Sequence, residues 1–193
     1  MENESRNKND LNTTKLTQNP SVQEKYIKKL FCQTKENYGE KYHEHYLELY
    51  KMYTNTAEKI SDRRQSNNSF FLTLNTAIIA VVSYLQLGKE AGESVELYWL
   101  ISVSGIIVCY AWYRLIKSYK QLNSGKFKIV NLLEKNLPIA PYDAEWEVLG
   151  RGKNHQLFIP FNKIETIVPW LFMGIHIAVL IRVFPWNLIM LFF

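Results

Sequence analysis

The chain has 193 residues, a formal net charge of +5 and two cysteines, Cys32 and Cys109. Because the two cysteines fall in separate predicted segments, no disulfide framework is indicated, which excludes a small secreted scaffold of that kind. No recognisable nucleic-acid-binding motif accompanies the positive charge, so a nucleic-acid partner is not expected. Three apolar blocks predict instead a multi-pass membrane protein, since each is close to the ~20 residues that span ~30 Å of hydrocarbon. The blocks are residues 69–87, 97–116 and 164–184.

The amino-terminal residues 1–21 are rich in Asn, Lys and Thr and have no apolar core. This composition predicts a disordered tail rather than a secretory signal. Residues 22–38 have the pattern of a short amphipathic helix, with Gly39 as its stop. We therefore predict that residues 22–68 are helical and lie in the cytosol.

The stretch from Tyr42 to Gly88 predicts one unbroken helix, charged in its first half and uncharged from Ser69 to Leu87. No Pro or Gly lies between the halves, so nothing in the local chemistry ends the helix where the charges end. Its apolar seam has a period of 3.5 residues, as expected of a helix that packs along a partner. A surface helix followed by an unrelated membrane helix is the alternative. The seam consists of Tyr46, Tyr50, Tyr53, Ala57, Ile60, Phe71, Leu74, Ile78, Val81 and Leu85, interrupted by Arg64 and Asn67.

Small and hydroxylated residues form a second pattern in the first apolar block. Small residues let helices in a bilayer approach closely, and polar ones find partners across the interface. The pattern therefore predicts a packing face against the second span or a neighbouring subunit, and a wet face that lines a pore is the alternative. The repeat is Ser69, Thr73, Thr76, Ala80 and Ser83, with Asn68 and Asn75 beside it. The pore-lining residues would be Asn68, Asn75, Thr76 and Ser83, with Arg63 and Arg64 at the cytosolic mouth.

The second apolar block also has no stop at its end, and its helix is predicted to continue until Pro138. The first two blocks thus predict an antiparallel transmembrane hairpin whose helices extend into the cytosol. A small-residue face on the second block could receive the first span; its residues are Ser102, Gly105 and Cys109.

Orientation follows from the basic residues. The link at residues 88–96 carries one Lys and three Glu, whereas residues 114–163 carry nine Lys or Arg and four Asp or Glu. The positive-inside rule places the amino terminus and the basic region in the cytoplasm. The cations expected at the membrane interface are Arg63, Arg64, Arg114 and Lys117.

The third apolar block carries two ionisable residues, His176 in its middle and Arg182 near its far end. Ionisable groups inside membranes are functional candidates, but a hydrogen bond from His176 to a neighbouring helix backbone is an equal alternative. The block either crosses the membrane fully, with Arg182 reaching the far side, or enters and turns back.

No residue pattern for catalysis, metal binding or phosphate binding is present. His43 and His45 are two residues apart, so they point in different directions on a helix and do not form a metal pair. Neither a phosphate-binding glycine loop nor a nucleophile elbow occurs. We expect no enzymatic activity and no cofactor.

Three runs resemble the sequences of RipA-like bacterial inner-membrane proteins. They are Ala57–Ala77 at the start of the first span, and Trp112–Ser124 and Ala140–Gly152 after the second. The resemblance covers about residues 45–175 and implies a small protein of the cytoplasmic membrane that assembles into a ring-like octamer. It supplies no catalytic site. The hairpin with cytosolic extensions and the stretch 63–68 are also similar to the two-span SLATT effectors of bacterial defence systems, a similarity that implies membrane permeabilisation.

The sequence therefore predicts an all-α membrane protein: a transmembrane hairpin with long cytosolic helical extensions and a third hydrophobic segment at the carboxyl end. The predicted segments are 1–21, 22–68, 69–116, 117–163 and 164–193. We expect a non-enzymatic homo-oligomer of the bacterial inner membrane that acts as a pore, conduit or scaffold. The alternative is a membrane-anchored adaptor that recruits a cytosolic protein through residues 138–160. A membrane enzyme or transporter that uses His176 and Arg182 is a third hypothesis.

Overall fold

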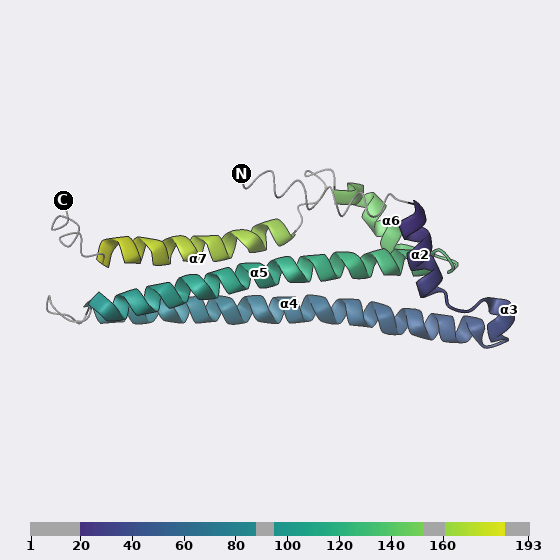
Figure 1. Cartoon of the computed structure of the whole chain (residues 1–193), viewed down its shortest axis with the longest axis horizontal. Helices are drawn as coiled ribbons and strands as arrows, with labels where there is room; N and C mark the ends of the chain where they lie inside the picture. The colour runs from purple at the N-terminus through teal and green to yellow at the C-terminus, as the bar shows by residue number, and fades with distance from the viewer. Residues whose placement is uncertain (1–19, 88–94, 153–160, 184–193) are drawn as a thin grey trace. The chain divides into compact units, whose positions relative to one another are not determined.

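The computed structural model describes residues 20–87, 95–152 and 161–183. Most of the predicted disordered tail, most of the acidic link and the apolar carboxyl end lie outside the described residues, as does the end of the 138–160 segment. The described elements are all helical, which confirms the predicted all-α class (Figure 1). They are α2 (Pro20–Leu30), α3 (Lys35–Tyr38), α4 (Tyr42–Leu87), α5 (Val95–Glu134), α6 (Pro141–Val148), the 3₁₀ turn η1 (Gly150–Gly152) and α7 (Phe161–Val183).

The chain divides into two compact units, residues 1–52 and 53–193, and α4 begins in the first and continues into the second. In the first unit, the single amphipathic helix predicted at residues 22–38 is wrong, because the structure has two helices there. The Thr34 hydroxyl accepts a hydrogen bond from the Asn37 backbone N–H and so starts α3 as a separate helix. Gly39 ends α3 with a φ of 90°, a conformation that favours glycine, as predicted.

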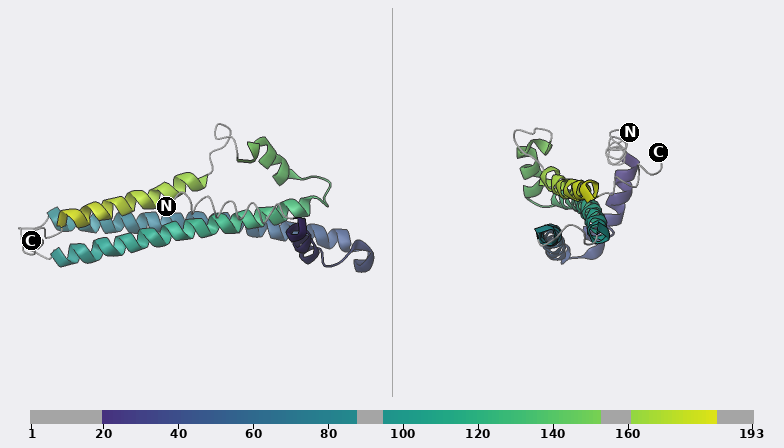
Figure 2. Two further views of the ribbon diagram at one scale, coloured as in Figure 1. Left: turned by 45° about the horizontal axis from the view of Figure 1, so that its top comes forward. Right: turned by 90° about the vertical axis from the view of Figure 1, so that its left-hand side faces the viewer.

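The second unit contains the rest of α4 together with α5, α6 and α7. Side-chain contacts pair α4 with α5 in antiparallel order, and α7 runs antiparallel to α5 (Figure 2). We call residues 69–87 of α4 and 97–116 of α5 the apolar half of this pair. Residues 53–68 of α4 and 117–134 of α5 form its charged half. The predicted hairpin with long helical extensions is therefore present.

The buried side chains of α5 follow a 3.5-residue spacing from Tyr98 to Ile116, and Val130 continues the same phase two heptads later, as in a helix that packs along a partner. They are Tyr98, Ser102, Cys109, Trp112, Ile116, Val130 and Glu134. On α4 the predicted seam is correct at Ala57 and Ile60 but wrong at Val81, which is 50% exposed, whereas Val82 is 5% exposed. A straight helix drifts by about 20° per heptad from a 3.5-residue repeat, so over several heptads the inward position moves to the next residue.

Two helices of the described part are long and apolar enough to cross a membrane, at Leu97–Glu134 and Ile164–Arg182. The uncharged run of α4 is not among them, so its crossing stays a prediction. Its contacts support that prediction, because Asn75 and Phe71 of α4 meet Cys109 and Trp112 within the apolar half of α5. α7 runs as one helix through Pro169 to Val183, without a reversal.

Candidate functional site

Three asparagines of α4, in or next to its apolar half, form hydrogen bonds with α5. Asn75 is fully buried; its amide donates to the Phe71 carbonyl at 2.8 Å, and its side-chain oxygen accepts from the Cys109 thiol at 3.1 Å. The Asn75 side chain thus forms one hydrogen bond to its own helix and one to α5. An amide in an apolar surrounding needs such partners, because an unpaired one costs the free energy of its desolvation.

The other two asparagines contact aromatic side chains of α5. The Trp112 indole N–H donates to Asn68 at 2.9 Å, and the Asn67 amide donates to the Tyr119 hydroxyl at 2.6 Å. Phe71 stacks on Trp112, with the rings nearly parallel and 5.8 Å between centroids. Sequence reasoning took Asn67 as an interruption of the seam and missed Tyr119. The signal for Tyr119 was its position seven residues after Trp112, on the same stripe of α5.

Thr76 and Ser83 lie on a different face of α4 from Asn68 and Asn75. Both are exposed, and their hydroxyls donate to the carbonyls of Leu72 and Ile79 in their own helix, at 2.8 and 2.9 Å. Such i−4 bonds satisfy a hydroxyl without a neighbour. The four residues predicted to share a face are therefore divided: two asparagines inside the pair and two hydroxyls outside it.

The predicted interface cations are also divided. Arg64 is largely buried, and its Nε lies 3.6 Å from the Glu165 carboxylate at the start of α7. The pair joins α4 to α7 at the level where the charged half of α4 ends. Arg63, Arg114 and Lys117 are exposed, as expected of side chains that reach lipid headgroups.

The two predicted ionisable residues of α7 differ in the same way. His176 is 1% exposed, and its imidazole lies so close to Gly105 of α5 that a Cβ at Gly105 would be 2.4 Å from the ring. The Nε2 atom of His176 and the hydroxyl of buried Ser102 have no hydrogen-bond partner among the described residues. Arg182 is exposed in the last turn of α7. Gly105 was predicted to belong to a small-residue face that packs on α4, but in the structure Gly105 packs on α7.

Aromatic contacts place the rest of α7 against α5. Trp170 packs edge-on against Tyr113, and Phe172 lies near Trp112, with ring centroids 5.6 and 6.3 Å apart. Together with His176 over Gly105, these contacts hold α7 antiparallel to α5 for most of its length. Within the described residues, no three His, Cys, Asp or Glu side chains lie together as the ligands of a metal ion would.

At the other end of α5, Glu134 holds α6 in place. Its carboxylate is buried, and its two oxygens accept from the backbone N–H groups of Tyr142 and Asp143, each at 3.1 Å. These N–H groups belong to the first turn of α6, where backbone N–H groups have no acceptor within the helix. The positive end of the helix dipole also favours a negative charge at this position. Sequence reasoning missed Glu134, because its role depends on how the chain returns after α5.

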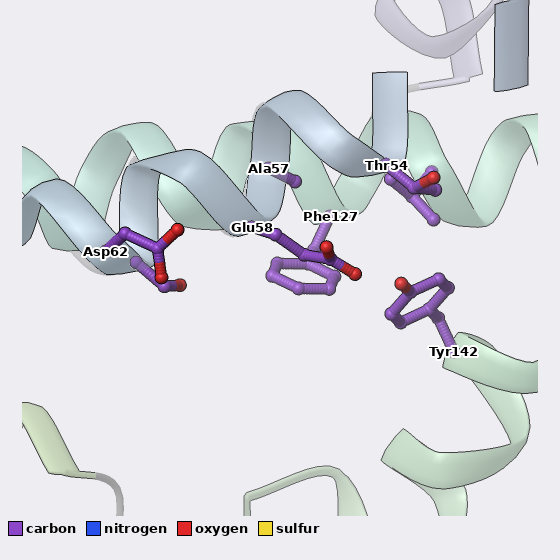
Figure 3. Close-up of a pocket in the computed structure, with 8 residues that line it drawn as sticks. Thr54, Ala57, Glu58, Asp62, Phe127 and Tyr142 are labelled. Atoms are coloured by element: carbon purple, nitrogen blue, oxygen red, sulfur yellow. The ribbon is translucent and has the colours of Figure 1, made fainter. Parts of the chain in front are cut away.

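A groove of about 390 Å³ opens between α4, α5 and α6 in the charged half (Figure 3). Its lining includes two carboxylates of α4, Glu58 and Asp62, and two aromatic rings, Phe127 and Tyr142, which pack edge-on at 5.6 Å. Burial, helped by the charges of Glu58, Glu134 and Glu145, raises the pKa of the Tyr142 phenol. The groove is therefore negative, with aromatic walls.

The model of one protein family matches residues 47–185, from the second turn of α4 to just beyond the end of α7. No curated protein and no solved structure matches the chain. The matched range contains every contact described above between α4, α5, α6 and α7, and it confirms the family resemblance seen in the sequence. The chain belongs to the octameric membrane protein family (8xMP).

Proposed function

We propose that the chain is a non-enzymatic subunit of an octameric scaffold in the bacterial inner membrane. The observation that carries this proposal is the engagement of Asn75 inside the subunit, between Phe71 and Cys109. Asn68 is likewise bonded to Trp112 of the same chain. The two amides that a polar pore would need at its wall are thus used for packing. The remaining face of α4 has hydroxyls that are already bonded, which suits close contact between helices.

In this proposal the apolar half and α7 lie in the bilayer, and the charged half projects into the cytoplasm. Seventeen residues separate Lys117 from Glu134 on α5. At 1.5 Å per residue, the end of α5 stands about 26 Å beyond the membrane boundary. The octamer would therefore hold a ring of helical stalks above the membrane surface.

Ion flux across liposomes tests the scaffold against the conduit. We expect purified octamer to leave the leak of K⁺ and of Cl⁻ at the level of protein-free liposomes. A sustained flux that Thr76→Leu abolishes, and that Val81→Leu leaves unchanged, would replace the scaffold with a conduit lined by the hydroxyl face. Val81 is a suitable control because it is also exposed on α4 but carries no hydroxyl.

The native cysteines test the orientation without any substitution at a contact. Cys32 is exposed and Cys109 is fully buried, so a membrane-impermeant maleimide should label only Cys32. We expect no labelling of spheroplasts and full labelling after lysis, with Cys32→Ser as the unlabelled control. Labelling of intact spheroplasts would contradict a cytoplasmic amino terminus.

A second candidate function is the recruitment of a cytosolic protein, as an adaptor, through residues 138–160. It is favoured by the exposure of two apolar side chains at the two ends of the fixed helix α6, Ile139 just before it at 72% and Val148 as its last residue at 78%. The end of α5, which leads into this segment, stands about 26 Å from the proposed membrane boundary, beyond the reach of lipid tails. The variant Ile139→Ser/Val148→Ser should keep the octamer and lose any cytosolic protein that co-purifies with the wild type. Retention of every such protein would count against the adaptor.

A further inference from the structure

The groove of the charged half has the chemistry of a site for a basic side chain. Figure 3 shows Glu58 directed toward the rings of Phe127 and Tyr142, with Asp62 one turn along α4. Carboxylates suit an ammonium or guanidinium head, and aromatic faces suit its aliphatic stem and its charge. Among the described residues, Glu58 and Asp62 form no ion pair with a cationic side chain.

The matching charges are on α5. From Leu97 to Leu133 this helix has no Asp or Glu, and its Lys and Arg residues in the charged half are mostly exposed. Lys126 is engaged, since it donates to the Thr56 hydroxyl at 3.0 Å. Lys117, Lys120 and Lys128 have no acidic partner within the described part of the chain. One subunit thus presents acids on α4 and bases on α5 that do not meet each other.

Depth in the membrane selects one of these bases. The residues of α5 that line the groove are Phe127 and Val130, and the contact Thr56–Lys126 places Glu58 of α4 close to the same level of the α4–α5 pair. Lys128 is exposed between Phe127 and Val130, whereas Lys120 lies seven residues before Phe127, about 10 Å along the helix. In a cyclic ring whose copies are all inserted in one orientation, equivalent residues lie at the same depth. Lys128 of one copy is therefore level with the groove of the next.

We propose that the groove between α4, α5 and α6 is a contact surface between copies, and that it receives the Lys128 side chain of the neighbouring subunit. The ammonium group pairs with Glu58 and Asp62, and the stem of the lysine packs on Phe127 and Tyr142. This is a head-to-tail contact, which closes into a ring when repeated around an axis. It rests on the octameric family and on the proposed position of the stalk outside the bilayer. It does not depend on whether the ring conducts.

Charge reversal in the two partners tests the contact. Like charges placed opposite each other disfavour association, so Lys128→Glu and Glu58→Lys/Asp62→Lys should each raise the protein concentration at which half of the octamer dissociates by about tenfold or more. Native mass spectrometry of the detergent-solubilised protein measures this midpoint. Lys135→Glu is the matched control, because Lys135 is exposed just beyond the end of α5, seven residues after Lys128. It should leave the midpoint unchanged.

Mixing the two reversed proteins decides between a contact within one copy and a contact between copies. In an alternating ring of eight, the glutamate introduced by Lys128→Glu would face a groove whose two carboxylates are both replaced by lysines. Each native Lys128 of the other variant would face a native groove. The mixture should therefore form octamers with nearly the wild-type midpoint, which also shows that both variants fold. Failure of the mixture to assemble, or an unchanged midpoint for Lys128→Glu alone, would overturn the proposal. Ion flux from an intact octamer would contradict the scaffold and leave this contact standing.

Discussion

The two halves of the α4–α5 pair bury different mixtures of side chains. In the charged half, the innermost side chains of the seam are mainly apolar, with Ala57, Ile60 and Val130 less than 9% exposed. In the apolar half, small and polar residues are buried beside apolar ones, with Asn75 and Ser102 fully buried and His176 of α7 pressed on Gly105. One helix pair therefore has a mainly apolar interior where its surface is charged, and a mixed interior of polar, small and apolar side chains where its surface is apolar.

The surrounding solvent explains the difference. Water drives apolar side chains together, so the charged half is held by burial of Ile60 and Val130. Lipid tails are as apolar as those side chains and give no such force, so helices in a bilayer are held by close approach and by hydrogen bonds across the interface. We therefore expect different substitutions to destabilise the two halves.

The largest effect should come from filling the contact between α5 and α7. A side chain at Gly105 would overlap the His176 ring, since even a Cβ would lie 2.4 Å from it. We expect Gly105→Leu to lower the free energy of unfolding in mixed micelles by about 3 kcal/mol, the upper range for an overpacked core. Circular dichroism during titration with denaturing detergent measures the change.

Gly174→Leu is the matched control, because nothing lies within 4 Å of the Cβ position of that α7 glycine. It should be much less harmful than Gly105→Leu. Removing the ring with His176→Ala in the Gly105→Leu background should recover part of the loss. Equal stability of the two leucine variants would mean that α7 does not pack on Gly105.

In the charged half, the largest effect should come from Glu134. Its carboxylate is buried and accepts two backbone N–H groups of α6. Hydrogen bonds to a charged group contribute about 1.5–3 kcal/mol, so Glu134→Ala should release α6 by about that amount. Hydrogen exchange at the Tyr142 and Asp143 amides should become faster, whereas Glu145→Ala, at an exposed position of α6, should leave it unchanged. Unchanged hydrogen exchange in Glu134→Ala would show that contacts other than those of Glu134 hold α6 in place.

Local chemistry was enough to predict the long helices. α4 was expected to be unbroken from Tyr42 because it contains no Pro or Gly. α5 was expected to continue beyond its apolar block because the next Pro is Pro138, and Gly125 weakens a helix without ending it. The break between α2 and α3 was missed, since the capping role of Thr34 depends on a single side-chain bond.

The partners of the polar residues could not be predicted from one helix alone. Asn75 was expected to need a partner, but the choice of Cys109 depends on the rotation of α4 against α5, which packing along the whole pair determines. The same rotation turned Val82 rather than Val81 inward. Pairs such as Arg64–Glu165, between residues about a hundred positions apart, likewise follow from tertiary structure.

A smaller effect should separate the two polar faces of α4. Asn75→Leu removes the bonds to Phe71 and Cys109 and places a branched side chain in a filled position. Since hydrogen bonds between membrane helices contribute about 0.6 kcal/mol on average and up to about 1.7 kcal/mol, we expect a loss of about 1 kcal/mol in the same unfolding titration. Thr76→Leu, one position along but exposed, should leave subunit stability unchanged. The reverse order would mean that the hydroxyl face, not the asparagine face, holds the subunit together.

The smallest effect concerns the substitution of glycine by alanine, which should change the free energy of unfolding in opposite directions in the two halves. Gly125 lies within α5 in the charged half, and nothing is within 4 Å of its Cβ position. An alanine there should stabilise the helix by about 0.5–1 kcal/mol, because glycine loses more backbone freedom on folding. Gly105→Ala should instead destabilise, since its methyl group would meet His176. Both variants are compared with the wild type by the same unfolding titration. If both stabilised the protein, α5 would gain from helix propensity alone, and the close approach of α7 would not be what holds the apolar half together.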